Sequence, residues 1–188
     1  AYVVNSEISN CASYCVYMSG GTQKFVHSTI ASYFGWPYTN INIHNGVRRD
    51  SAAAVYINNI NKEYAATAAS FTSCIIAGGR KNNLRVATPL SEYYEGSFSG
   101  NYLQCDSLPS AFAHDNVYGL PTDTVFRNIY YRIGEYRYFD FRLDSVSPAR
   151  GIGDTLLIHN PNTDTLLIHD QSGTPRKPRP DAGCYEFE

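Results

Sequence analysis

The sequence predicts an all-β fold in which short strands from successive repeats stack as a solenoid. Three segments resemble one another, and they cover residues 4–8, 26–30 and 71–75. The first two begin 22 residues apart, and the third begins 45 residues later, close to twice that period. This period, in segments rich in β-branched and aromatic residues with Gly and Asn turns between them, favours stacked strands. A leucine-rich repeat has a similar period, but this half of the chain has almost no leucine.

Each repeated segment predicts one interior face and one solvent face, because side chains alternate along a strand. Stacked in register, the interior faces form three ladders: Val4/Val26/Phe71, Ser6/Ser28/Ser73 and Ile8/Ile30/Ile75. The opposite face is mostly polar and is expected to contact solvent: Asn5, Glu7, His27, Thr29, Thr72 and Cys74. We expect residues 40–44 or residues 54–58 to supply the strand between the second and third segments.

The second half of the chain is less regular. Residues 98–105 and 124–133 have strand composition, and prolines punctuate the loops around them. The sequence Asp-Thr-Leu-Leu-Ile-His occurs at 154–159 and again at 164–169. The residues between the two copies favour a turn, so a terminal hairpin is predicted. We therefore expect stacked strands with long loops over residues 1–142 and a closing segment of the same domain over residues 143–188.

The composition argues against several classes of protein. Charged residues make up only 17% of the chain and the net charge is -2, unlike the basic surface of a nucleic-acid-binding protein. No apolar run approaches the length of about 18 residues that a transmembrane helix needs, so no membrane span is predicted. The five cysteines lack Cys-x-x-Cys spacing, so no zinc site is predicted. We expect them to be small buried residues, with room for one disulfide if the protein is secreted.

The C-terminal segment has the most specific sequence. It contains Ser-Pro-Ala at 147–149, an Asp-Gln-Ser-Gly-Thr-Pro-Arg run at 170–176 and Pro-Asp-Ala-Gly-Cys-Tyr-Glu at 180–186. These motifs resemble the closing signature of bacterial right-handed parallel β-helix repeat proteins. Ala182, Cys184 and the Arg-Gly-Ile-Gly run at 150–153 depart from the usual pattern of that family.

This resemblance implies a right-handed parallel β-helix of which the chain supplies the C-terminal rungs plus a closing cap. Arg176 is expected to pair with Asp170 or Asp181 and so fix the cap over the open end of the solenoid. The resemblance also implies an extracytoplasmic location, either secreted or anchored at the outer surface. Because residues 2–8, from Tyr2 to Ile8, already read as a core strand, we expect further N-terminal rungs or a partner chain against them.

The resemblance implies two functional classes, polysaccharide-degrading enzymes and non-catalytic modules that bind a glycan or a partner protein. In a β-helix enzyme, catalytic carboxylates would occupy equivalent positions in successive rungs, but Glu7 aligns with Thr29 and then Cys74. We therefore predict a binding module with no catalytic residue, metal or cofactor in this segment. The alternative is the C-terminal part of a lyase or glycoside hydrolase whose catalytic rungs lie elsewhere. His159 and His169 could approach each other across the expected hairpin, but paired surface histidines seldom bind metal.

Aromatic residues in loops are the predicted carbohydrate-binding residues, and these are Trp36, Tyr38, Tyr93 and Tyr94. Exposed aromatic rings stack on the apolar faces of sugars with little loss of conformational entropy. The alternative is that these rings pack across the exterior of the strands. The sequence does not identify the glycan.

Overall fold

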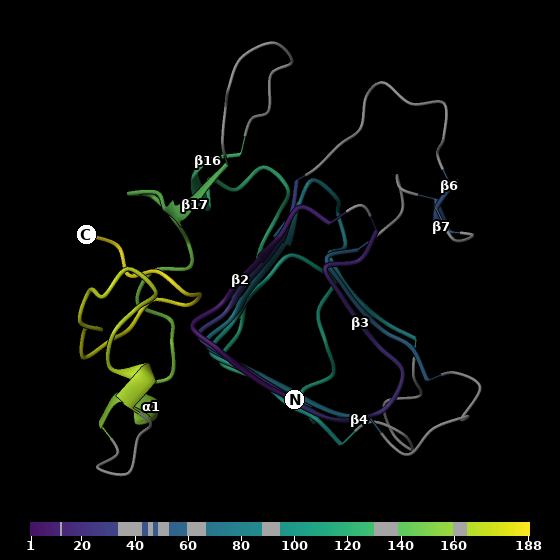
Figure 1. Ribbon diagram of the computed structural model, residues 1–188, viewed down its shortest axis with the longest axis horizontal. Helices are drawn as coiled ribbons and strands as arrows, with labels where there is room; N and C mark the ends of the chain where they lie inside the picture. The colour runs from purple at the N-terminus through teal and green to yellow at the C-terminus, as the bar shows by residue number, and fades with distance from the viewer. Residues whose placement is uncertain are drawn as a thin grey trace.

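The protein has an all-β fold built mainly from parallel sheets (Figure 1). The computed structural model describes residues 1–11, 13–33, 53–59, 67–87, 95–129, 139–159 and 165–188, and the backbone of 43–44 and 47–48. Within these ranges the helical elements are the short α1 (Leu156–His159) and the 3-10 turn η2 (Thr165–Leu167).

Three parallel sheets contain most of the strands. The first has the order β1 (Tyr2–Val4), β4 (Gly21–Val26), β9 (Thr67–Thr72), β12 (Phe98–Ser99) and β14 (Ala113–His114). The second has the order β2 (Glu7–Ser9), β5 (Thr29–Ser32), β10 (Ile75–Gly78), β13 (Tyr102–Leu103) and β15 (Val117–Tyr118). The third contains β3 (Val16–Met18), β8 (Val55–Ile57) and β11 (Leu84–Val86). Seen along the stack in Figure 1, the three sheets border a triangular interior.

Two small antiparallel pairs accompany the parallel sheets. One joins β6 (Ile43–His44) to β7 (Val47–Arg48), and the other joins β16 (Phe126–Asn128) to β17 (Asp140–Leu143). The expected strand between the second and third repeats is wrong, because β4 pairs directly with β9 and β5 with β10, and residues 54–58 instead contain β8 of the third parallel sheet. The predicted strand over residues 98–105 is two strands, β12 and β13, which belong to different sheets.

The spacing of 22 residues is confirmed between the first two repeats, where Val4 pairs with Val26 and Ile8 with Ile30. The register predicted for the third repeat is wrong by one residue. Phe25 pairs with Phe71 and Ile30 with Ile76, while Ile75 pairs with Thr29. The predicted ladders through Ile75 and Ser73 are therefore incorrect.

Each repeated segment was predicted to be one continuous strand. This is wrong, because the backbone bends sharply within each segment. Asn5, His27 and Ser73 have φ values of 46°, 45° and 55°, which places each in the left-handed region. The bend directs the chain from the first sheet into the second, so side-chain alternation does not continue across it. As a result Val4 and Val26 do not join the interior ladder, which instead contains Val3, Phe25, Phe71 and Phe98.

Stacked phenylalanines fill the interior beside the first sheet. The ring centroids of Phe25 and Phe71 lie 4.8 Å apart and those of Phe71 and Phe98 lie 5.2 Å apart, with interplanar angles of 5° and 3°. Ile30 and Ile76 of the second sheet pack in the same core. The parallel register brings identical side chains above one another, which favours offset stacking of the rings.

Polar side chains form a second ladder next to the corner. The Ser6 and Ser28 hydroxyls donate to the carbonyls of Val4 and Val26 at 2.8 and 3.0 Å. Further along the stack Asn101 takes this place, where its Oδ1 accepts from the Cys74 N–H at 2.7 Å and its Nδ2 donates to Asn116 Oδ1 at 2.8 Å. The bonds to Val4, Val26 and Cys74 give side-chain partners to backbone groups at the bend.

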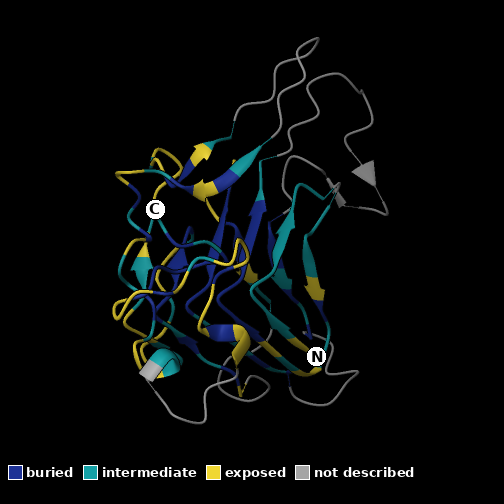
Figure 2. Cartoon of the chain, turned by 60° about the vertical axis from the view of Figure 1, so that its left-hand side comes forward, coloured by how far each residue is buried: buried dark blue, intermediate teal, exposed yellow. Residues whose placement is uncertain are grey.

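The C-terminal segment covers the outer face of the second sheet, with the exposed residues of the segment in front of buried strands in Figure 2. The Cys184 N–H donates to Thr29 Oγ1 at 3.1 Å, and Tyr185 OH donates to Glu7 Oε2 at 3.0 Å. A Cβ atom on Gly183 would lie 2.7 Å from Ile75 Cδ1 and Thr29 Oγ1, so only glycine permits this approach. The segment therefore runs along the side of the stack, which corrects the expectation of a cap over its end.

This lateral packing overturns the expected exposure of the polar face. His27 and Thr29 are buried rather than solvent-facing, because the C-terminal segment lies against them, and Cys74 is buried because it faces the interior core. The predicted terminal hairpin is also wrong. Asp154 Oδ1 accepts the Leu156 N–H at 2.9 Å and caps the start of α1, and the second copy of the repeated sequence contains η2.

Replacing Phe71 with alanine should destabilise the protein by about 3–5 kcal/mol, because Phe71 stacks between two other rings and has no exposed surface. Urea denaturation followed by circular dichroism measures this loss. Leu120→Ala, at an exposed leucine, is the control and should change stability by no more than about 0.5 kcal/mol. A similar small change for Phe71→Ala would contradict the interior ladder.

Candidate functional site

The four residues predicted to bind carbohydrate, Trp36, Tyr38, Tyr93 and Tyr94, lie outside the described residues. Their role stays a prediction. His159 ends α1, and His169 is exposed and follows η2, so the two histidines do not lie on paired strands of a hairpin. Within the parts of the chain that the structure describes, no three His, Cys, Asp or Glu side chains are grouped as metal ligands.

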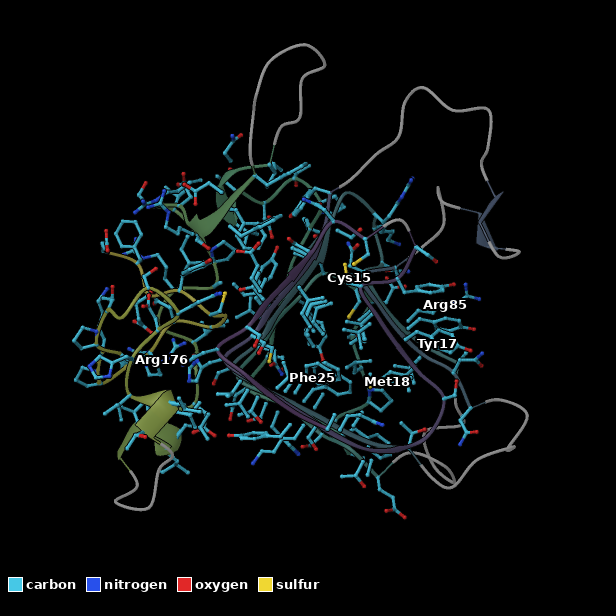
Figure 3. All side chains as sticks on the ribbon, in the orientation of Figure 1. Cys15, Tyr17, Met18, Phe25, Arg85 and Arg176 are labelled. Atoms are coloured by element: carbon cyan, nitrogen blue, oxygen red, sulfur yellow. The ribbon has the colours of Figure 1, made fainter. Side chains whose placement is uncertain are left out.

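The third parallel sheet carries a cluster of aromatic side chains on its outer face. Each of its strands has three residues, and the first and third of them are apolar. Of these apolar residues, Met18, Val55 and Ile57 are part of the interior core. Alternation therefore turns the middle residue outward. The register aligns Tyr17 with Tyr56 and Tyr56 with Arg85, and Figure 3 shows Tyr17 and Arg85 on the outside of the triangle.

Tyr14, which precedes β3, completes this surface, which we call the tyrosine cluster: Tyr14, Tyr17, Tyr56 and Arg85. The ring of Tyr56 lies 4.9 Å from that of Tyr14 and 5.6 Å from that of Tyr17, measured between centroids. The Arg85 guanidinium lies 5.1 Å from the Tyr56 ring centre, within the range of a cation–π contact. Three rings and one cation thus form a continuous surface across neighbouring strands.

The tyrosine cluster combines apolar area with polar groups that face solvent. Tyr17 is 54% exposed, and its hydroxyl accepts a hydrogen bond from Asn58 Nδ2 at 3.0 Å. Partial burial, followed by the neighbouring Tyr56, raises the pKa of Tyr14, so its hydroxyl stays protonated and can donate a hydrogen bond. A surface of this kind can stack on the apolar face of a sugar ring while hydroxyl and guanidinium groups bind the sugar hydroxyls.

Sequence reasoning did not find this cluster. Its signal in the sequence is a three-residue pattern in which Tyr or Arg stands between two apolar residues. The pattern occurs at Val16–Met18, Val55–Ile57 and Leu84–Val86. The middle positions are 39 and 29 residues apart, so the triplets do not follow the spacing of 22 that revealed the first two repeats. A search for the triplet itself, without a fixed period, would have identified it.

A group of buried charges holds the C-terminal segment in place. Arg176 Nη1 donates to Glu186 Oε1 at 2.9 Å, and both side chains are fully buried. This corrects the expectation that Arg176 pairs at the surface with Asp170 or Asp181. Those carboxylates instead accept backbone N–H groups, including that of Glu186 at 2.8 Å for Asp170 and that of Gly151 at 2.6 Å for Asp181.

Arg176 also connects the segment to the first repeat. Its Nη2 donates to Asn5 Oδ1 at 2.6 Å and to the Gly183 carbonyl at 3.1 Å. Burial lowers the pKa of Arg176 and raises that of Glu186, each partly opposed by the other's charge. This arrangement is structural, because neither charged group reaches the surface.

His27 lies under the same segment. Burial, followed by the positive charge of Arg176, lowers the pKa of His27 well below its usual value. A fully buried histidine has no access to a substrate, so we assign His27 a structural role and not that of a general base.

The five cysteines are free thiols. Burial raises the pKa of Cys15 to about 11 and that of Cys74, Cys105 and Cys184 to about 12. Because the thiolate is the nucleophile, these four residues are poor candidates for covalent catalysis.

Comparison with family models, curated proteins and solved structures found no match to this chain. Among the described residues, no helix has the length and apolar character needed to cross a membrane.

Removing one partner of the buried ion pair should destabilise the protein more than removing both partners. Arg176→Met leaves Glu186 buried without its cation and should destabilise the protein by about 3–5 kcal/mol. The double variant Arg176→Met/Glu186→Met removes both charges, so its loss should be well below the sum of the two single losses. Denaturant unfolding of the four proteins measures the coupling, and simple additivity would contradict a direct buried pair.

His27 should make stability depend on pH. Because its pKa is lowered in the folded state, the unfolded chain binds the proton more readily below about pH 6.5. The contribution of His27 is therefore complete above that pH and is lost as the pH falls, by at most about 1.4 kcal/mol per pH unit. His27→Asn should flatten the profile between pH 7 and 5. Asparagine suits this backbone, since Asn5 occupies the equivalent place with φ 46°.

The matched control for this titration is His114→Asn, at an exposed histidine of β14, which should keep the profile of the parent protein. Unfolding free energies at a series of pH values provide the measurement. Identical profiles for His27→Asn and the parent protein would show that His27 does not sense pH.

Proposed function

We propose that this chain is a right-handed parallel β-helix module that binds carbohydrate at the bacterial cell surface through its tyrosine cluster. The three parallel sheets, visited in the same order by successive repeats, support the architecture. The sequence of the C-terminal segment, which resembles the closing signature of bacterial β-helix proteins, supports the extracytoplasmic location. The ligand is a glycan that presents an extended apolar face.

The cluster of tyrosine rings on the outer face of the third sheet is the observation that carries this proposal. Cross-strand aromatic pairs also stabilise sheets, by about 0.2–1 kcal/mol each. That gain would not require Tyr17 to remain 54% exposed, with its hydroxyl directed to a neighbouring amide. Solvent-facing rings on adjacent strands form a platform whose length follows the strand spacing of about 4.8 Å. A linear saccharide can lie along such a platform and contact one ring after another.

Catalysis is not part of the proposal. In the observed register Glu7 aligns with Thr29, Ile75, Tyr102 and Val117, so this column of the described strands has a single carboxylate. Glycoside hydrolysis needs two carboxylates on either side of the scissile bond. The lyase or glycoside hydrolase alternative places its catalytic rungs elsewhere.

A partner chain or further rungs against residues 2–8 remains a second proposal. The strands β1, β2 and β3 are the outermost strands at one end of all three sheets. Their outer backbone groups offer a template for pairing with additional parallel strands. We propose that such strands continue the stack at this end.

Removing rings from the platform should weaken glycan binding. Tyr17→Ala and Tyr56→Ala should each reduce affinity about tenfold, or about 1.4 kcal/mol, because each removes a stacking surface for the sugar. Affinity electrophoresis against neutral and acidic polysaccharides identifies a ligand, and titration calorimetry with oligosaccharides from that ligand measures the loss. Tyr118→Ala, at a partly exposed tyrosine of the second sheet, is the control and should bind as the parent protein does.

The loop aromatics can be tested in the same experiment. Trp36→Ala, compared with Tyr17→Ala/Tyr56→Ala, separates the predicted loop site from the tyrosine cluster. Full affinity in the double tyrosine variant together with loss in Trp36→Ala would move the site to the loops. Full affinity in every variant would contradict both assignments.

A further inference from the structure

We propose that the C-terminal segment carries a second binding site, which takes a tetrahedral oxyanion of the phosphate or sulfate type between Arg150, Lys177 and Arg179. This site does not depend on the tyrosine cluster. The C-terminal segment lies beside the second sheet, whereas Tyr17 and Arg85 project from the third sheet on the other side of the triangle (Figure 3).

The three cations line a single hollow in the surface. Its volume is about 420 Å³, and its walls include Arg150, Lys177, Arg179 and the rim residue Val146. Two separate stretches of sequence meet here, the Ser-Pro-Ala region at 145–151 and the Lys-Pro-Arg region at 177–179. The fold therefore brings Arg150 beside the basic residues Lys177 and Arg179.

Neutral groups hold these cations in position. Arg150 donates to the Ser145 carbonyl, and its guanidinium lies 4.0 Å from the ring centre of Phe187. Lys177 donates to the Phe187 carbonyl, with its Nζ 5.8 Å from the same ring centre. Arg179 Nη2 contacts the Gly151 carbonyl at 3.4 Å. These contacts orient the side chains without neutralising them.

One carboxylate lines the hollow, and it offsets only part of the charge of the three cations. Asp181 is buried, and its two oxygens accept the backbone N–H groups of Gly151 at 2.6 Å and Phe187 at 2.7 Å. Among the described residues, the ion pairs are Lys81–Asp106, Arg142–Asp140 and Arg176–Glu186, and none involves the three cations of the hollow. The hollow therefore presents a local excess of positive charge on a chain whose net charge is -2.

The arrangement of donors favours a group with more than two oxygens. One guanidinium satisfies a carboxylate through two parallel hydrogen bonds, so a carboxylate would leave the other cations without a partner. A phosphate or sulfate presents three or four oxygens and so has an acceptor for each of the three cations. Val146, which is 72% exposed at the rim, offers apolar contact to the organic part of a phosphate or sulfate ester.

Titration with inorganic phosphate and inorganic sulfate at low ionic strength tests the site, with acetate as the carboxylate control. We expect saturable binding of phosphate or sulfate at least fivefold tighter than that of acetate, with amide NMR shifts concentrated at Gly151 and Phe187. Raising the salt concentration should weaken binding, because exposed charges are screened. Binding of acetate as tight as that of phosphate and sulfate would overturn the choice of ligand, and no saturable binding would overturn the site.

Variants at two of the three cations locate the binding. Lys177→Gln and Arg179→Gln should each lower phosphate affinity at least fivefold, and the double variant should abolish saturation. Lys81→Gln, which removes an exposed lysine paired with Asp106, is the charge-matched control and should bind as the parent protein does. Tyr17→Ala should also keep full phosphate affinity, which separates this site from the proposed glycan platform. Undiminished binding in Lys177→Gln/Arg179→Gln would overturn the proposal.

Comparison of the free ion with an ester identifies the source of the oxyanion. Glucose 6-phosphate that binds more tightly than inorganic phosphate, with the gain lost in Val146→Ser, would support an ester of an organic ligand. Equal affinity for both would support recognition of the oxyanion alone. Exclusion of the ester while the free ion binds would overturn the role of Val146.

Discussion

The left-handed corner between the first two sheets is the constraint on which the rest of the structure depends. Asn5, His27, Ser73, Gly100 and Asp115 follow one another in the stack with φ values between 45° and 63°. Each repeat must adopt this backbone to pass from one sheet to the next. Asparagine, aspartate and glycine adopt it with little strain, whereas His27 and Ser73 need support from their surroundings.

That support comes from the C-terminal segment, which binds the corner over several repeats. Arg176 reaches Asn5, the Gly183 N–H donates to the Ser73 carbonyl at 2.7 Å, and the Asp154 N–H donates to Ser73 Oγ at 2.8 Å. The buried Arg176–Glu186 pair fixes the geometry of the segment that makes these contacts. The corner and the segment are thus mutually dependent, and the burial of His27 is a consequence of their contact.

How much the sequence predicts can be traced to this same corner. The all-β fold and the spacing between Val4 and Val26 were predictable, because Val, Ser and Ile recur at the same offsets in both repeats. The third repeat was misaligned by one residue because Ser73, not a residue resembling Asn5, occupies the left-handed position. Alternation cannot reveal a bend that no glycine or proline marks. The hairpin prediction failed for a related reason, since Asp154 accepts a local backbone N–H and starts a helix instead of a strand.

Tyr102 and Tyr17 show why the candidate site escaped prediction. Both face outward from a parallel strand, yet Tyr102 is buried in the core that β16, β17 and the C-terminal segment form beside the second sheet and donates to Asp123 Oδ2 at 2.9 Å, while Tyr17 stays exposed. The two residues are of the same type, and alternation along the strand turns both side chains outward. Their difference arises from which sheet the distant C-terminal segment covers, and that is a property of tertiary packing. The segment leaves the outer face of the third sheet open, and the rings of Tyr14, Tyr17 and Tyr56 meet on that face, so the proposed glycan platform stays accessible because the segment binds elsewhere.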